Sequence, residues 1–92
     1  MQDFHFRLYL SGQSPLSLRA LSNLQAICQA YLPGRHRIEV IDVLAEPQRA
    51  LAEGVLVTPT LVRIVPATST RIMGDLSAAT TVVAAFGIAA PQ

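Results

Sequence analysis

The turn at Thr58-Pro59-Thr60 constrains this chain most, because it stands between two apolar runs. An X-Pro bond takes the cis form at a cost of only about 0.5–1 kcal/mol, and in folded proteins a cis bond usually marks a tight turn. Proline has no N–H to donate to a strand ladder, so within sheets it is confined to strand starts, edges and bulges. We therefore expect a strand that begins near Thr60 and is entered through a fixed turn at Pro59.

The rest of the chain has the pattern of alternating strands and helices. Apolar residues alternate from Phe4 to Leu10, which predicts a half-buried strand. Ser14 followed by Pro15 is typical of a helix N-cap and first helical residue, and Pro33-Gly34 should end that helix. The other expected elements are a strand over 37–43, a short helix over 48–53, strands over 60–65 and 71–74, and a helix over 78–88 capped by Ser77.

The predicted order is β-α-β-α-β-β-α. A strand, a helix and a second strand form a right-handed crossover with parallel strands, whereas the third and fourth strands are close enough in sequence for an antiparallel hairpin. This order is the thioredoxin-like arrangement of the α/β class. In that arrangement the turn before the third strand lies beside the loop after the first strand, so we expect Thr58-Pro59 to face residues 11–15.

Composition limits the classes of function. The 92 residues suffice for a single domain over 1–92; 51% are apolar and only 14% charged, against about 25% charged in a typical domain. So apolar a domain is expected to bury surface against a protein partner or in a homo-oligomer, a dimer or tetramer. A net charge of +1 argues against nucleic acid. With no signal-peptide pattern and no apolar run of about 20 residues, we expect a cytoplasmic protein without a membrane span.

The residues of a thiol enzyme are absent from the expected site. A redox thioredoxin needs a thiolate at the start of its first helix, but residues 11–15 read Ser-Gly-Gln-Ser-Pro. Cys28 falls on the apolar stripe of that helix, which predicts a packing role. A serine nucleophile would need a base, yet His5 and His36 lie elsewhere and read as surface residues. No Cys/His spacing fits a metal site, so we expect no catalysis, cofactor or metal.

The chain resembles the KaiB family of small clock proteins. The resemblance rests on segments 8–15, 40–48, 58–61 and 71–77, which follow one another in order along nearly the whole chain. It implies a non-enzymatic regulator that binds a KaiC-type ATPase in a circadian clock or a clock-derived signalling system. It also implies homo-oligomers and an alternative ground-state fold, βαββααβ, for which the β-branched run Thr80–Val83 within the last expected helix is a modest physical hint.

The resemblance also implies where partners bind. The KaiC-facing surface of the family maps to Phe4, Arg37 and Glu39, and Arg19 lies near a surface used by other clock partners. Glu39 stands where members of the family generally carry a lysine, and an inverted charge can change partner choice. Thr58 and Pro59 are expected to form a structural turn rather than to hold a substrate.

Two other functions remain open at this point. The Ile-Asp-Val segment over 41–43 and the Thr58-Pro59 turn also occur in the thioredoxin-like sensor domain of SasA-type histidine kinases, which would place the chain in a kinase pathway. The thioredoxin-like arrangement also hosts glutathione-linked and thiol-linked redox enzymes. That second alternative needs a reactive group that the sequence does not offer at residues 11–15.

Overall fold

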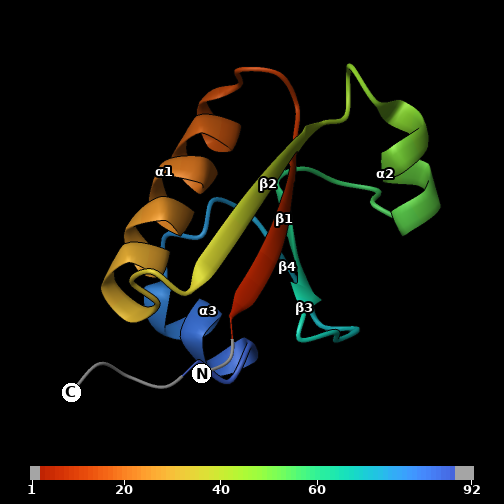
Figure 1. Ribbon diagram of the computed structural model, residues 1–92. Coiled ribbons are helices and arrows are strands. Elements are labelled where there is room, and N and C mark those ends of the chain that lie inside the picture. Colours follow the sequence, from red (N-terminus) through yellow and green to blue (C-terminus); the bar gives the residue numbers. More distant parts are fainter. Residues whose placement is uncertain (1–2, 89–92) are drawn as a thin grey trace.

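A computed structural model of the chain describes residues 3–88 (Figure 1). Its element order confirms the predicted β-α-β-α-β-β-α arrangement. The bounds agree with the sequence-based expectations to within a residue or two, except at the last helix. The elements are β1 Phe4–Leu10, α1 Pro15–Tyr31, β2 His36–Asp42, α2 Pro47–Glu53, β3 Thr60–Val65, β4 Arg71–Met73 and α3 Ala79–Ala85.

The four strands form one mixed sheet in the order β2-β1-β3-β4. Strands β1 and β2 are parallel, with Phe4 opposite His36 and Leu10 opposite Asp42. Strand β3 is antiparallel to β1 and to β4. The predicted crossover and hairpin are therefore both present, and the outermost strands are β2 on one side and β4 on the other.

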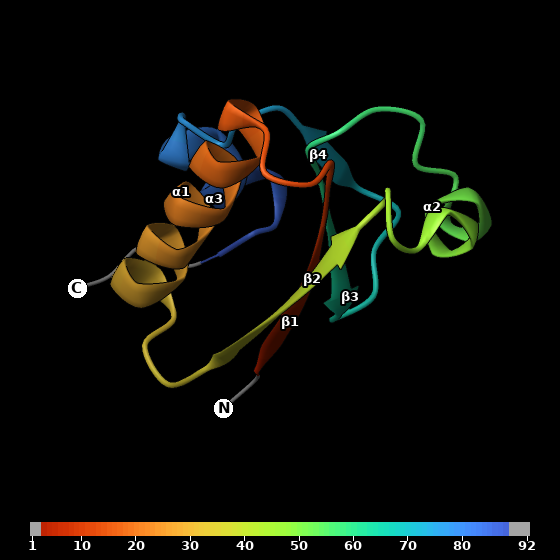
Figure 2. The same cartoon turned by 90° about the horizontal axis from the view of Figure 1, so that it is seen from above.

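The helices cover the two faces of the sheet unequally. Helices α1 and α3 lie over one face and α2 lies over the other (Figures 1 and 2). Strand side chains alternate between faces, so Phe6 and Leu8 of β1 enter the larger core with Leu24 of α1, whereas Tyr9 points to α2. The smaller core under α2 consists of Tyr9, Ile41, Ala50, Val55 and Val62.

The first helix forms as its sequence predicts. The Ser14 hydroxyl accepts a hydrogen bond from the Ser17 N–H at 3.3 Å, and Pro15 is the first helical residue. Cys28 is fully buried on the apolar face, and burial raises the pKa of its thiol to about 12. The predicted packing role of Cys28 is therefore confirmed. The structure describes no helix that is both long and apolar enough to cross a bilayer.

The predicted cap and the predicted end of the last helix are wrong, although its start lies within one residue of the expected position. Helix α3 begins at Ala79 after Ala78, and no side chain caps it. The Ser77 N–H instead donates to the Asp75 carboxylate at 3.1 Å, which holds Ser77 in the turn that precedes the helix. At the other end Gly87 has a φ of +62°, a left-handed conformation that terminates helices.

The Thr58-Pro59 turn has the position that the sequence predicts. Its peptide bond is cis, and strand β3 begins immediately afterwards at Thr60. The Ser11 and Thr58 hydroxyl oxygens lie 2.5 Å apart, which confirms that this turn faces the loop after β1. The described residues adopt the thioredoxin-like arrangement, and the alternative fold of the family stays a prediction.

Candidate functional site

The outer edge of β2 is open in the described part of the chain. Strand β2 pairs only with β1, and Arg37 and Val40 are exposed along it, Val40 to 42%. An edge strand presents unpaired backbone N–H and C=O groups that another chain can bind. The predicted partner residues Arg37 and Glu39 both lie on this strand, so the structure brings these two together.

Phe4 is adjacent to Arg37 but its ring is not on the surface. Its exposed fraction is 8%, and its ring stacks on Phe6 with 6.1 Å between centroids. It contributes to the wall of a 230 Å³ depression that Arg37 and His36 also line, at the end of the sheet where β1 and β2 begin. That depression brings Phe4 close to Arg37, and the role of Phe4 in binding stays a prediction.

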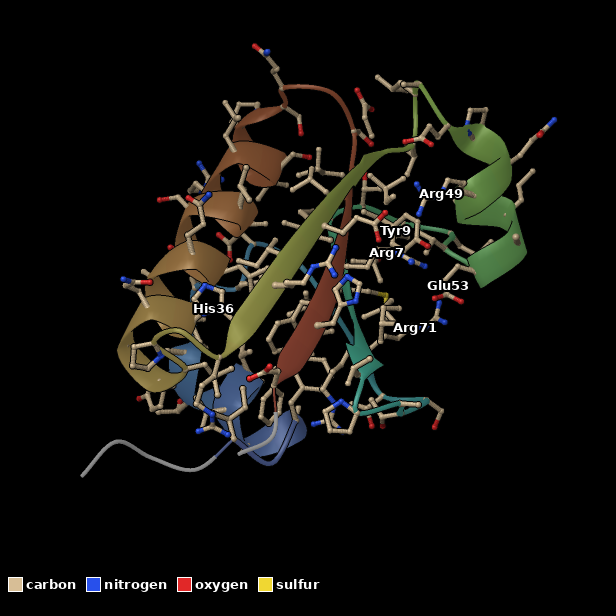
Figure 3. The ribbon with its side chains drawn as sticks, viewed as in Figure 1. Arg7, Tyr9, His36, Arg49, Glu53 and Arg71 are labelled. Carbon is tan, nitrogen blue, oxygen red and sulfur yellow. The ribbon has the colours of Figure 1, made fainter. Side chains whose placement is uncertain are left out.

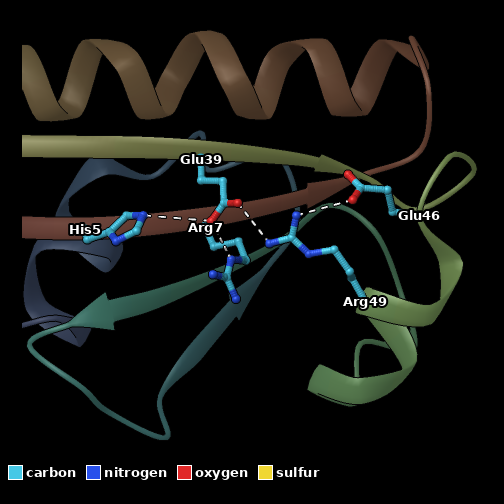
Figure 4. A network of polar contacts seen from close by, with 5 residues as sticks. All are labelled: His5, Arg7, Glu39, Glu46 and Arg49. Atoms are coloured by element: carbon cyan, nitrogen blue, oxygen red, sulfur yellow. Dashed lines mark hydrogen bonds and ion pairs between the residues drawn. The ribbon is translucent and has the colours of Figure 1, made fainter.

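Glu39 is the centre of a charge network on the α2 side of the sheet (Figure 4). One carboxylate oxygen accepts from Arg7 Nε at 2.8 Å and the other from Arg49 Nη2 at 2.9 Å. Arg49 also pairs with Glu46 at 3.3 Å. The network therefore joins β2 to β1 through Arg7 and to α2 through Arg49.

Charge-assisted hydrogen bonds set the protonation of these groups. The bonds from Arg49 and then from Arg7 lower the pKa of Glu39, and the same bonds raise the pKa of both guanidinium groups. Glu39 stays ionised, and two arginines compensate its charge within the molecule. Its predicted effect on partner choice is untested, but the carboxylate does not project into solvent as an isolated negative charge.

The two histidines are less exposed than the sequence suggests. Both are half-buried rather than surface residues. His36 places Nδ1 2.7 Å from the Leu32 carbonyl oxygen, whereas His5 Nε2 is buried, lies 3.9 Å from the Glu39 carboxylate and has no hydrogen bond among the residues described. Figure 3 shows His36 on β2. Among the described residues, neither histidine is hydrogen-bonded to the loop over 11–15.

The loop beside the Thr58-Pro59 turn is held by structural bonds. Asp42 accepts from the backbone N–H groups of Gly12 and Leu44, each at 2.9 Å, and these bonds, that of Gly12 first, lower the pKa of Asp42. The Ser14 hydroxyl donates to that of Ser17 at 2.8 Å. These polar groups satisfy one another and the backbone, so the arrangement fits the structural turn predicted for Thr58 and Pro59.

Arg19 belongs to a separate polar contact. It is exposed on α1, and its Nε lies 3.5 Å from the Asp75 carboxylate. Asn23 of the same helix donates to the Asp75 carbonyl oxygen at 2.7 Å. Arg19 and Asn23 thus fasten the segment between β4 and α3 to α1, and Arg19 takes no part in the Glu39 network.

Sequence reasoning missed the two arginines that hold Glu39. Arg7 and Glu39 are direct partners in the parallel β1–β2 register, and Arg49 lies in the first turn of α2 near the end of β2. Once β1 and β2 are aligned as parallel strands, the opposite charges of Arg7 and Glu39 predict an ion pair. The contribution of Arg49 depends on how α2 packs, which no local pattern specifies.

Comparisons with known sequences and structures agree with this architecture. A family model described as the KaiB domain matches residues 7–88. The chain is 44% identical over 77 residues to the circadian clock protein KaiB3 of Synechocystis sp., covering 84% of this chain and 76% of that protein. It is 46% identical over 76 residues to the circadian clock oscillator protein KaiB of a Prochlorococcus marinus strain, covering 83% of this chain and 65% of that protein, just under two thirds of its length.

Solved structures of similar shape are more distant in sequence. The solution structure of the N-terminal domain of Synechococcus elongatus SasA has a TM-score of 0.75 and 23% identity, covering 95% of this chain and 86% of that domain. Chloroplastic thioredoxin z has a TM-score of 0.73 and 20% identity, covering 94% of this chain and 78% of that protein. At these identities the likeness is one of fold alone.

Proposed function

The chain belongs to the KaiB family, and on that premise we propose that it is a non-enzymatic regulator that binds a KaiC-type ATPase in a circadian clock or a clock-derived signalling system. The observation that carries the proposal is the KaiB domain match over residues 7–88, together with curated clock relatives about 45% identical. We further propose that the chain is a single domain that self-associates, since nine large hydrophobic side chains of the described residues are exposed, Leu44 and Leu56 among them.

The open edge of β2 supports this strand as the docking surface. Arg37 is exposed there, and the half-buried Glu39 network on the α2 side fastens the strand to β1 and α2. An extended segment of a partner can add to such an edge through main-chain hydrogen bonds, while neighbouring side chains provide specificity. Arg37 is the residue of this edge best placed to contact an acidic partner group.

The test is co-elution of the chain with the KaiC homologue of its own host, with and without ATP. Arg37→Glu is expected to weaken the complex about tenfold or more, because it reverses an exposed charge beside the proposed docking edge. Gln29→Glu, which also introduces a glutamate at an exposed position but on α1, is the control and should leave binding unchanged. Absence of a complex with every KaiC homologue of the host would contradict the proposal.

A second candidate is a sensor domain in a SasA-type histidine kinase pathway. The likeness in fold to the SasA N-terminal domain favours this candidate. The two candidates predict different partners: a histidine kinase in one case and a KaiC homologue in the other. Parallel co-elution with both proteins distinguishes them. Identity to KaiB proteins is about twice as high as identity to the SasA domain, so the regulator of a KaiC-type ATPase is the preferred candidate.

A thiol-linked enzyme has less support. Cys28 is the one cysteine of the sequence, it is fully buried, and burial raises its pKa to about 12. Insulin reduction or glutathionyl turnover would reverse this ranking if it survived Cys28→Ser and disappeared on substitution of Ser11 or Ser14. The likeness to thioredoxins concerns the fold and supplies no reactive group.

A further inference from the structure

His5 carries a buried polar atom that the fold leaves without a hydrogen bond. Its Nε2 is buried and makes no hydrogen bond among residues 3–88, although the side chain as a whole is 23% exposed. Buried side-chain nitrogens are mostly hydrogen-bonded, so one that is not needs a physical explanation. The Glu39 carboxylate oxygen Oε1 lies 3.9 Å from this nitrogen, which is too far for a hydrogen bond but close enough for an ion pair (Figure 4).

The contact between His5 and Glu39 depends on whether the imidazole carries an extra proton. Histidine is the side chain that ordinarily changes charge between pH 5 and 8. Glu39 is ionised throughout that range, because the hydrogen bonds from Arg49 and then from Arg7 lower its pKa. A neutral imidazole is uncharged and carries only one N–H, whereas an imidazolium is positive and has an N–H on both ring nitrogens. Proton uptake by His5 therefore creates an ion pair with Glu39.

The charged groups on the side of the sheet that His5 faces come from three elements. Strand β1 contributes Arg7, two residues further along on the same face. Strand β2 contributes Glu39 and also Arg37, which is the direct register partner of His5. Helix α2 contributes Arg49 through its bond to Glu39. The arginines oppose a further positive charge, but the Glu39 carboxylate is the group that faces Nε2 directly (Figure 4).

Strand β3 and the start of β1 change this balance little. On β3, the apolar Val65 is opposite His5, and Arg63 is bonded to the C-terminal end of α3 on the other face of the sheet. Asp3, before β1, is exposed and lines the 230 Å³ depression that His5 also lines. A proton on His5 therefore adds positive charge where β1 adjoins the exposed edge strand β2.

We propose that His5 makes the β2 edge respond to pH: in mild acid the protonated ring pairs with Glu39 and adds a positive charge beside Arg37. The inference rests on the docking surface proposed above and describes its regulation. Because His5 and Arg37 are register partners, the added charge lies next to the exposed cation of the edge. Mild acid should therefore strengthen the binding of a partner that presents an acidic group to Arg37.

The first measurement uses the chain alone. The nitrogen-15 resonance of Arg7 Nε reports on Glu39, because this nitrogen donates to Oε1 of Glu39 at 2.8 Å. As the pH is lowered from about 8 to about 5.5, the resonance should shift in the wild type and stay in place in His5→Gln. His36→Gln removes the other histidine of the sequence and is the matched control, so its shift should equal that of the wild type. A wild-type resonance that does not move, or that moves equally in His5→Gln, would overturn the pairing of His5 with Glu39.

The second measurement is the affinity for the KaiC homologue of the host at about pH 8 and about pH 6. The wild type should gain about threefold or more in affinity at the lower pH relative to His5→Gln, which corrects for the titrating groups of the ATPase itself. His5→Lys carries a positive charge at both pH values, so it should bind at pH 8 as tightly as the wild type binds at pH 6. The same change in affinity in the wild type and His5→Gln would overturn the pH response.

The outcomes separate this inference from the proposed function on which it rests. A complex with the KaiC homologue whose affinity ignores His5 would contradict the regulation and leave the regulatory function of the chain intact. Absence of a complex with every KaiC homologue of the host would contradict the docking surface and with it the regulation, even where the Arg7 resonance shows that His5 pairs with Glu39.

Discussion

At the scale of single residues, Glu39 illustrates how packing changes the meaning of a charge. In the sequence it is an acid on a strand that the family resemblance assigns to partner binding. In the structure Arg7 and Arg49 each occupy one of its carboxylate oxygens, and Arg49 is in turn paired with Glu46. Because each contact comes from a different element, the carboxylate contributes to the position of α2 over the sheet.

Replacing Glu39 by glutamine should lower the free energy of unfolding by about 0.2–1 kcal/mol, the range for exposed ion pairs, since the Glu39 side chain is 34% exposed. Glu39→Lys should cost more, because it places a third cation between Arg7 and Arg49. Urea unfolding at neutral pH is the measurement. Glu46→Gln is the control, and an equal loss from that variant would mean that Glu39 has no special place in the network.

The stability that Glu39 supplies should depend on pH. Its pKa in the folded chain is lowered, chiefly by the hydrogen bonds from Arg49 and Arg7, so its contribution is fully present above the unfolded pKa of about 4.3. That contribution is lost as the pH falls through the lower folded pKa. The difference in unfolding free energy between wild type and Glu39→Gln should therefore shrink in acid. If the difference in unfolding free energy stayed constant as the pH fell below about 4.3, the stabilisation would not come from the ionised Glu39 carboxylate.

At the scale of elements, the sequence predicts a helix or strand well when the residues that determine it lie within that segment. Strand β1 and helix α1 were predicted closely, because alternation and the Ser14-Pro15 pair act within the segment itself. The cap of α3 was not, because Leu76 takes a positive φ of 61° and is buried, and the Asp75 carboxylate accepts from the Ser77 N–H. Those contacts depend on the surrounding fold. Gly87, in contrast, is a residue type that commonly ends helices, and it can be recognised in the sequence.

The C-terminal end of α3 depends on one side chain of β3. Arg63 donates from Nη1 to the Phe86 carbonyl oxygen and from Nε to the Pro66 carbonyl oxygen, the latter at 2.7 Å. Its guanidinium carbon also lies 5.5 Å from the centroid of the Phe86 ring and 5.6 Å from that of Phe4. Arg63 thus fastens the short helix α3 to the sheet by hydrogen bonding and by cation–π contact.

Arg63→Met should therefore loosen α3 more than the rest of the fold. Methionine keeps much of the apolar length but loses the donors and the charge, and we expect a loss of about 1–3 kcal/mol of stability. Hydrogen exchange should rise first in Ala79–Ala85, before the amides of β1. Arg37→Met on the exposed edge of β2 is the control. Uniform acceleration in both elements would contradict a local role for Arg63.

At the scale of the whole molecule, the sheet has two free edges with different chemistry. Strand β2 presents an open edge with the exposed cation Arg37, whereas β4 adjoins an apolar depression lined in part by Leu56, Val57 and Met73. Neither difference follows from composition, which predicted only that apolar surface would be buried against another chain. Strand order had to be known before Arg37 and Leu56 could be assigned to opposite edges of the sheet.

This separation makes the two proposed interactions independent. The edge strands β2 and β4 are divided by β1 and β3, so a contact between chains at the exposed Leu56 beside β4 leaves the β2 edge free. Leu56→Ser should therefore change self-association but alter the affinity for the KaiC homologue by less than about threefold, as expected for distant sites that do not share contacts. Arg37→Glu should do the reverse. Titration of the KaiC homologue into wild type and both variants, followed by sedimentation, measures both equilibria together. Dissociation of a wild-type homo-oligomer as the ATPase binds would contradict this independence, because it would mean that the two partners compete for one surface or for one conformation of the chain.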